Sequence, residues 1–204
     1  MIPAARRRGR VGVLVVSLVF GVTTSAPAGP ASDQLKVGID KVIHVLADPS
    51  LKGTAKAKQR RDALHEIAGP LFDWSEMASR ALGRHWQPRT EAERQEFVRL
   101  FHDLLERSYL TTLERYNGER VAYGTESIEG EQATVRTQVF NKAGQQFPVD
   151  YRLVRRGDRW LVYDVVIEGV SLVANYRAQF DQIIGTSSYE KLVDKLVDKL
   201  KSPS

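Results

Sequence analysis

Asp164 is the residue best placed to do chemistry. It is the one polar residue in the run WLVYDVVI at residues 160–167, and a short, nearly all-apolar run is typical of a strand covered on both faces. A carboxyl group inside an apolar pocket can serve as a general base. The alternative is a structural carboxylate that accepts hydrogen bonds from nearby backbone or from an arginine, and this is the role we expect.

The four histidines are His44, His65, His85 and His102, and no two of them have the spacing of a metal-binding motif such as HExxH. His44 and His65 lie in separate helical segments beside charged residues, so we expect both at the surface. His85 and His102 could meet in space, although no spacing requires it. The chain has no cysteine, which excludes disulfides, thiolate metal sites and a cysteine nucleophile. We therefore predict no metal site.

The first residues carry the signals of export. Four arginines within residues 6–10 precede the apolar run VGVLVVSLVFGV, and residues 26–28 fit the A-x-A cleavage pattern of a secretory signal peptide. The apolar run is shorter than the roughly 20 residues that a membrane-spanning helix needs. We predict a signal peptide at residues 1–28 and a soluble periplasmic chain after cleavage, with a retained anchor helix as the alternative.

The net charge of the exported chain argues against nucleic acid as a partner. The full sequence has a formal net charge of +5, and removing the four arginines of the signal peptide leaves +1. Nucleic-acid binding depends on clustered positive charge, so it loses its main support.

The exported chain, residues 29–204, is predicted to form a single domain. Helical spacing of apolar residues predicts helices at residues 33–47, about 54–68, 72–82 and 90–117. Asp73 with Glu76, and Thr90 with Glu93, have the spacing of capping boxes. Ser171 is placed to cap a further helix.

Between these helices the apolar period changes from about 3.6 to 2. Alternation predicts strands near residues 120–125, 133–139, 147–153 and 160–167, separated by short turns. The result is a four-stranded antiparallel meander packed against helices, which is an α+β fold. A curved sheet wrapped around helices would form a cone with an apolar interior.

The last predicted helix starts at a third capping box, Ser187 and Glu190, and continues KLVDKLVDKLK. Its leucines and valines share one face, so it could lie on a membrane. Its polar face balances lysine and aspartate rather than being mainly basic. We therefore expect it to pack against the domain.

Several stretches together resemble the MlaC family of periplasmic lipid carriers, also called the toluene-tolerance or ABC-transporter auxiliary family. They are FDWSEMASRALGRHW at residues 72–86, the helix after it, YRLVRRGDRWLVYDVVIEGVSLVANYRAQF at residues 151–180, and the terminal KLVDKL helix. The resemblance covers about residues 33–200, which is nearly the whole exported chain.

This resemblance implies a fold related to the cone-shaped NTF2-like group and no catalytic activity. It implies a deep apolar pocket between sheet and helices that holds the acyl chains of a phospholipid, with the head group exposed. The phospholipid is cargo, and no cofactor is implied. The implied partners are an outer-membrane lipoprotein complex and an inner-membrane ABC transporter with an MCE-domain protein. The carrier is expected to be a monomer that helps to maintain outer-membrane lipid asymmetry.

We expect the pocket to be lined from the long helix, the sheet and the helix after the sheet. The predicted lining residues are Phe97, Leu100, Phe101, Leu104, Val135, Val139, Val149, Tyr151, Leu153, Val162, Val173 and Tyr176. The strand at residues 160–167 is apolar on both faces, so its period does not show which face is inward.

Three other functions remain open on the sequence alone. The first is a hopanoid-associated carrier of the same family. The second is a small periplasmic NTF2-like enzyme that uses Asp164 as a base. The third is an adaptor that only links parts of a transporter.

Overall fold

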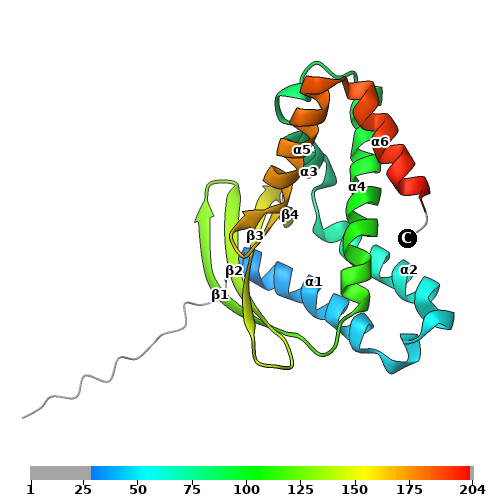
Figure 1. Ribbon diagram of the computed structural model, residues 1–204. Helices are drawn as coiled ribbons and strands as arrows, with labels where there is room; N and C mark the ends of the chain where they lie inside the picture. The colour runs from blue at the N-terminus through cyan, green and yellow to red at the C-terminus, as the bar shows by residue number, and fades with distance from the viewer. Residues whose placement is uncertain (1–28, 203–204) are drawn as a thin grey trace, which may run out of the picture.

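The structure, a computed structural model, describes residues 29–202 (Figure 1). The predicted signal peptide lies outside the described residues. Within residues 29–202, every helix is too short or too polar to cross a membrane.

In the part of the chain that the structure describes, six α-helices lie to one side of a single sheet (Figure 1). They are α1 (Pro30–Ala47), α2 (Ala57–Ala68), α3 (Trp74–Leu82), α4 (Glu91–Glu114), α5 (Leu172–Thr186) and α6 (Tyr189–Lys201). Short 3-10 turns join α1 to α2 and flank α3. The predicted helical segments are therefore all present, in the predicted order.

Local side-chain chemistry fixes where most of these helices begin. The Asp73 carboxylate accepts the backbone N–H of Glu76, and Thr90 with Glu93 forms a complete capping box. Ser171 caps α5 as predicted. The prediction for α6 was wrong by one residue, because Ser188 is the cap and its hydroxyl accepts the N–H of Lys191.

The sheet is a five-stranded antiparallel meander in the order β1-β2-β3-β4-β5. Its strands are β1 (Arg120–Glu129), β2 (Gln132–Phe140), β3 (Gln146–Arg156), β4 (Arg159–Ile167) and β5 (Val170–Ser171). The four predicted strands are confirmed. The two-residue β5 was not predicted, and it exists because a tight turn at Glu168 and Gly169, both at positive φ, folds the chain back onto the end of β4.

The first strand is longer than predicted. It continues to Glu129 because a register shift between Tyr123 and Glu126 restores its pairing with β2. A shift of this kind is a β-bulge, in which β1 has one more residue than β2 between two paired positions. Such a bulge bends the strand locally.

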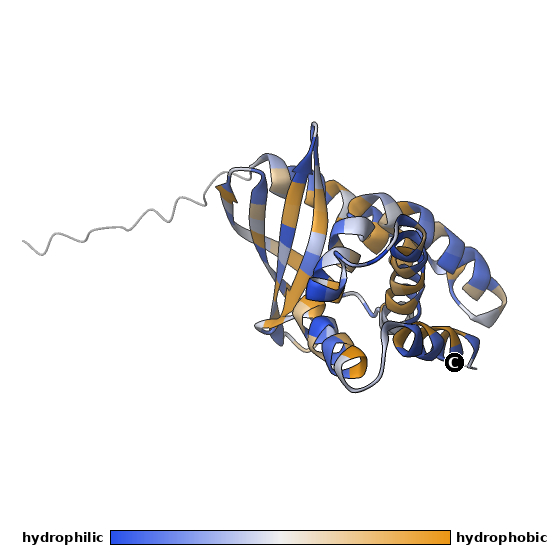
Figure 2. Ribbon diagram, turned by 90° about the horizontal axis from the view of Figure 1, so that it is seen from above, coloured by the Kyte–Doolittle hydropathy of each residue, from blue (hydrophilic) through white to orange (hydrophobic). Residues whose placement is uncertain are grey.

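The register defines one face of the sheet, which we call the inner face. Cross-strand partners in an antiparallel sheet point to the same side, and Val135 pairs with Tyr151, which pairs with Val165. Apolar and polar residues alternate along these strands (Figure 2). α1 packs against this face through Ala31 and Leu35.

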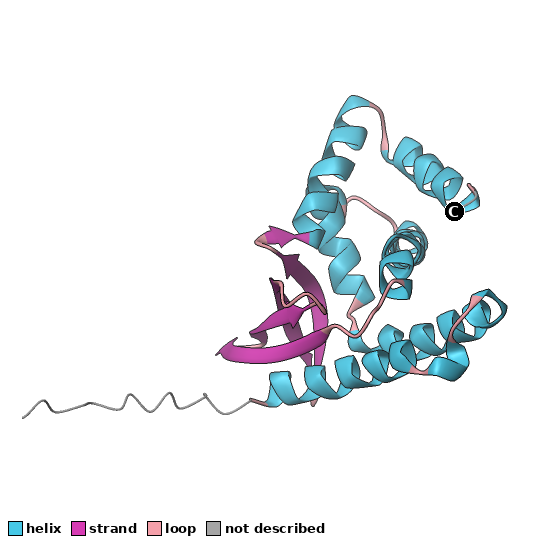
Figure 3. Ribbon diagram, turned by 60° about the horizontal axis from the view of Figure 1, so that its bottom comes forward, coloured by secondary structure: helices cyan, strands magenta, loops and turns pink. Residues whose placement is uncertain are grey.

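Two hydrophobic clusters divide the interior. The sheet core joins the first half of α1 to the inner face. The helical core joins α3, α4, α5 and α6, and Figure 3 shows helices lying beside the sheet. Phe72 packs against both clusters, and its backbone forms a bridge to Val162 of β4. A smaller cluster, centred on Val45, Leu46 and Leu64, holds α2 against the end of α1.

Candidate functional site

One end of the inner face is covered by α1, and we call it the closed end. Here Val135, Leu153 and Val162 are each at most 1% exposed and pack with Ala31 and Leu35 of α1. This part of the face is ordinary close-packed core.

Directional polar contacts hold α1 at the closed end. The Glu126 carboxylate of β1 accepts the N–H of Ser32 at 2.6 Å. On the other side of the helix, Gln34 accepts the N–H of Trp160 at 2.9 Å and donates to the carbonyl of Asp158 at 3.0 Å. These bonds attach the first turns of α1 to β1 and to the start of β4.

The other end of the inner face keeps accessible apolar surface, and we call it the open end. Val139 pairs with Phe147, and Val149 pairs with Ile167, so all four side chains lie on the inner face. The first three are half-buried and Ile167 is 40% exposed. Apolar side chains in contiguous, partly exposed positions are characteristic of ligand-binding or partner-binding surfaces.

Two tyrosines lie between the closed and the open end. Tyr123 and Tyr151 both pack against the sheet core, yet each keeps part of its surface accessible. Burial raises the pKa of Tyr151 to about 12, because the phenolate would lose its hydration. The hydroxyl of Tyr123 is buried and has no hydrogen-bond partner among residues 29–202. The site is thus mainly apolar, and of its buried hydroxyls that of Thr137 donates to the carbonyl of Val149 while that of Tyr123 has no such partner among these residues.

The predicted lining residues fall into three places. Val135, Leu153 and Val162 lie at the closed end with Tyr151 beside them, and Val139 and Val149 lie at the open end. The remaining six belong to the helical core: Phe97, Leu100, Phe101, Leu104, Val173 and Tyr176. The structure therefore gathers the sheet residues on one face and places the helix residues in the neighbouring cluster.

Aromatic packing explains why the helix residues cluster together. Phe97 and Phe101 stack at 6.0 Å between ring centroids, and Phe180 meets both rings edge-on at 5.7 Å. Tyr176 is half-buried and meets Phe101 edge-on at 5.3 Å. Such arrangements add to the stabilisation from apolar burial.

Tyr123, Phe147 and Ile167 lie on the inner face at or near the open end but are not among the predicted lining residues. Phe147 belongs to the same alternating pattern as Val149 and Tyr151, so the period-2 signal already places it on their face of the strand. Tyr123 and Ile167 are placed on the face by strand register, which depends on the irregularities in β1 and β4.

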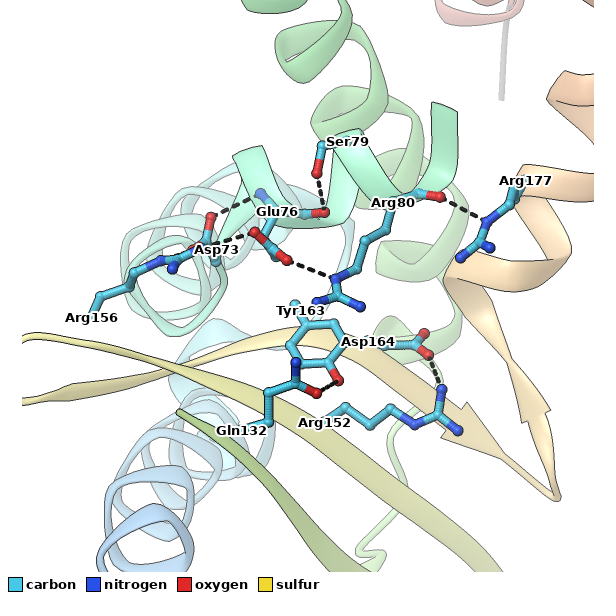
Figure 4. A network of polar contacts seen from close by, with 10 residues as sticks. All are labelled: Asp73, Glu76, Ser79, Arg80, Gln132, Arg152, Arg156, Tyr163, Asp164 and Arg177. Carbon is cyan, nitrogen blue, oxygen red and sulfur yellow. Dashed lines mark hydrogen bonds and ion pairs between the residues drawn. The ribbon is translucent and has the colours of Figure 1, made fainter. Parts of the chain in front are cut away.

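Asp164 accepts hydrogen bonds from three donors, and Figure 4 shows its contact with Arg152. It is 2% exposed, and its carboxylate accepts from Arg152 at 3.1 Å, from the Ser171 hydroxyl at 2.6 Å and from the N–H of Val173 at 3.0 Å. The last two donors belong to the start of α5. Asp164 therefore joins β3, β4 and the N-terminus of α5, which is the structural role expected from the sequence.

A second polar network attaches α3 to the sheet (Figure 4). Arg156 donates to Asp73 at 2.8 Å and to Glu76 at 2.9 Å, so the cap of α3 is tied to the end of β3. Glu76 also accepts from Arg80, whose guanidinium lies 4.1 Å from the ring centroid of Tyr163. These ion pairs are consistent with a positioning role rather than a catalytic one.

A cleft of about 440 Å³ lies between the end of α1, the start of α2 and the end of α4. Its walls combine apolar and cationic residues: Leu46, Lys52, Gly53, Thr54, Ala57, Arg60, Leu113 and Tyr116. None of the predicted lining residues belongs to this cleft.

His85 and His102, which the sequence left free to meet, have different neighbours in the structure. The Nε2 atom of His85 lies 2.8 Å from Asp181, which lowers the pKa of that carboxyl by hydrogen bonding. His102 instead lies beside His65, with 5.4 Å between ring centroids. His65 is half-exposed, as expected of a surface histidine.

Comparison with known proteins gives a consistent picture. The model of the MlaC protein family matches residues 36–198. The toluene tolerance protein ttg2D of Pseudomonas putida is 24% identical over 191 residues, covering 93% of this chain and 87% of that protein. The intermembrane phospholipid transport system binding protein MlaC of Haemophilus influenzae is 23% identical over 158 residues, covering 73% of this chain and 74% of that protein.

One solved structure is similar to this protein in both fold and sequence. The phospholipid-binding protein of Ralstonia solanacearum, determined in complex with a phospholipid, superposes with a TM-score of 0.72 at 26% identity. The match covers 84% of this chain and 99% of that one. The family match spans well over half of the sequence. The chain belongs to the MlaC family.

Proposed function

We propose that this protein is a periplasmic phospholipid carrier that binds acyl chains against the open end of the inner face. The observation that carries the proposal is the contiguous, partly exposed apolar surface of Val139, Phe147, Val149 and Ile167. Family membership and the likeness to a protein solved with a phospholipid support it.

The buried hydroxyl of Tyr123 supports a ligand that is not purely hydrocarbon. A buried hydroxyl is expected to have a hydrogen-bond partner, and this one has none among the described residues. An ester carbonyl of a phospholipid would accept this hydrogen bond while its acyl chains cover the apolar side chains nearby.

Physical chemistry explains why such a carrier needs a shielded surface rather than a reactive group. Moving one methylene into water costs about 0.8 kcal/mol, so a lipid with about thirty of them faces a barrier on the order of 24 kcal/mol. A protein that encloses the chains during transit removes most of this barrier. The structural role of Asp164 agrees with a function that has no catalytic step.

The proposed cycle runs between two membranes. The carrier exchanges lipid with an outer-membrane lipoprotein complex and with an inner-membrane ABC transporter whose MCE-domain protein faces the periplasm. It acts as a monomer after removal of residues 1–28. Intact-mass measurement of the periplasmic protein should give a chain that begins close to Gly29, whereas retention of residues 1–28 would indicate an anchored protein.

Lipid extraction tests the proposal directly. Protein purified from the periplasm, or incubated with phospholipid vesicles, should yield bound phospholipid by mass spectrometry of the organic extract. Recovery of hopanoids instead would assign the other carrier class. A chain that never carries lipid under either condition would exclude the carrier function.

A matched pair of substitutions locates the binding surface. Val149→Asp places a charge on the open end and should abolish most lipid binding, because a buried carboxylate beside acyl chains is strongly disfavoured. Val37→Asp is the control, since that valine is 56% exposed on α1 and lies outside the sheet. Equal lipid occupancy in the two variants would show that the acyl chains bind elsewhere.

A further inference from the structure

Two histidines and a glutamate from separate helices converge on the side of the protein away from the sheet. His65 comes from the last turns of α2, and His102 and Glu106 lie one turn apart on α4. One ligand atom of each residue lies within 4.8 Å of the other two. We propose that these three side chains bind a divalent transition-metal ion, with Zn²⁺ as the representative cation.

The distances fit such an ion after small side-chain adjustments. Nδ1 of His65 lies 3.2 Å from Oε2 of Glu106. Two ligands of a tetrahedral zinc ion, each about 2.0–2.1 Å from the metal, are about 3.4 Å apart. This pair therefore already has the spacing of metal ligands. The ligand atom of His102 lies within 4.8 Å of the other two, so it has to move by at most about 1.4 Å to reach the same spacing.

His102 is the oriented member of the set. Its side chain is 19% exposed, and Trp74 packs edge-on against its ring with 4.3 Å between centroids. Trp74 is in turn fixed by a hydrogen bond to the carbonyl of Gly69. The Asp103 carboxylate lies 3.3 Å from Nδ1 of His102. A carboxylate beside a metal-binding imidazole orients the ring and increases its basicity.

His65 and Glu106 supply the adaptable ligands. Their side chains are 51% and 31% exposed, so both can change rotamer without disturbing the core. Two imidazoles and one carboxylate form a ligand set typical of zinc with a fourth position for water. The exposure of His65 gives this fourth position access to solvent.

Metal binding at this position would join α2 to α4. The main packing of α2 in the described structure is against α1, through Leu64 and its neighbours. α2 and the end of α4 also both line the 440 Å³ cleft. A metal ion would therefore restrict the movement of α2 and hold this cleft in one shape.

Zinc titration of the exported chain, purified without a polyhistidine tag, tests the site. The parent should bind one Zn²⁺ per chain by calorimetry. His65→Ala and Glu106→Gln should each weaken binding by about tenfold or more. His44→Ala is the control, because it removes an imidazole from the neighbouring helix α1 and should leave the affinity unchanged. Absence of binding to the parent, or binding by His65→Ala and Glu106→Gln as tight as that of the parent, would overturn the proposal.

Amide hydrogen exchange shows whether a bound zinc ion also restricts the movement of α2. Zinc should slow exchange in α2 of the parent and leave exchange in the His65→Ala protein unchanged. If zinc binds with the predicted residue dependence but exchange in α2 does not slow, the ion does not hold the helix. Both experiments are independent of lipid binding, so they succeed or fail separately from the carrier function.

Discussion

Replacement of Asp164 gives the sharpest test of how the sheet is joined to the helical core. Its carboxylate is buried and accepts hydrogen bonds from Arg152, Ser171 and Val173. Val173 is the second residue of α5, so its N–H has no partner within the helix. Asp164→Ala removes the only acceptor that the structure shows for this N–H, whereas Asp164→Asn retains one oxygen at nearly the same position.

The expected loss of stability follows from the three bonds taken separately. The Val173 N–H is left buried without a partner, which costs about 1–3 kcal/mol. The Ser171 hydroxyl loses a bond worth about 1 kcal/mol. Arg152 is 46% exposed and can return to water, so its share is at most about 1 kcal/mol. The free energy of unfolding should therefore fall by about 3 kcal/mol in Asp164→Ala.

The asparagine variant should lose less, about 1–1.5 kcal/mol. Its amide oxygen can still accept from Val173, but its amide NH₂ replaces an acceptor beside the Arg152 guanidinium. For a domain of this size, 1 kcal/mol corresponds to about 2–4 °C in melting temperature. The alanine variant should therefore melt roughly 6–12 °C below the parent.

Urea unfolding of lipid-free protein, followed by circular dichroism, measures these differences. Asp194→Ala is the matched control, because that carboxylate is 62% exposed and its pairing with Lys191 contributes little. Loss of less than about 1 kcal/mol in Asp164→Ala would refute the structural assignment. A catalytic role would instead appear as a normally stable Asp164→Asn protein that accumulates an unconverted substrate.

Three further predictions address the site and the packing around it. Tyr151→Trp should reduce lipid occupancy after vesicle incubation while lowering the free energy of unfolding by less than about 1 kcal/mol, whereas overpacking of a closed core would cost about 1–3 kcal/mol. Burial raises the pKa of Tyr151 from 10.0 to about 12. The contribution of this tyrosine to stability should therefore be complete below pH 10 and be lost as the pH rises through 12. Urea unfolding at a series of alkaline pH values should show that the free energy of unfolding depends less on pH in Tyr151→Phe than in the parent. Leu192→Ala should cost about 2–5 kcal/mol in urea unfolding, since this α6 residue is 0% exposed, and no loss would mean that α6 does not pack on the domain.

Much of the fold could be predicted because its signals are local. The Thr90 and Glu93 capping box lies within one turn of helix, so neighbouring sequence alone fixes it. The alternating pattern from Phe147 to Leu153 likewise predicts a strand with one apolar face. Ser187 and Ser188 show the limit of such signals. Both residues can cap a helix, and Ser187 is excluded because it ends α5, where its N–H bonds to the carbonyl of Ile183.

The candidate site was less predictable because it depends on where separate elements meet. Periodicity places Val135 and Val149 on one face, but it does not show that α1 covers the first and leaves the second partly accessible. The same limit applies to His65 and His102. They are distant in sequence and converge only because α2 and α4 lie side by side at this point.

The incomplete coverage of the inner face has a physical cause in how α1 is attached. Hydrophobic packing is non-directional, so apolar contacts alone would allow α1 to slide toward the open end and bury more surface. The bond from Ser32 to Glu126 and the two bonds made by Gln34 fix the helix at the closed end, because each requires a defined distance and direction. A few polar residues in the first turns of α1 thus keep apolar surface available on Val139 and Val149. Removing these bonds with Glu126→Ala and Gln34→Ala should let α1 move over the open end and lower lipid occupancy after vesicle incubation, although neither residue belongs to the open end.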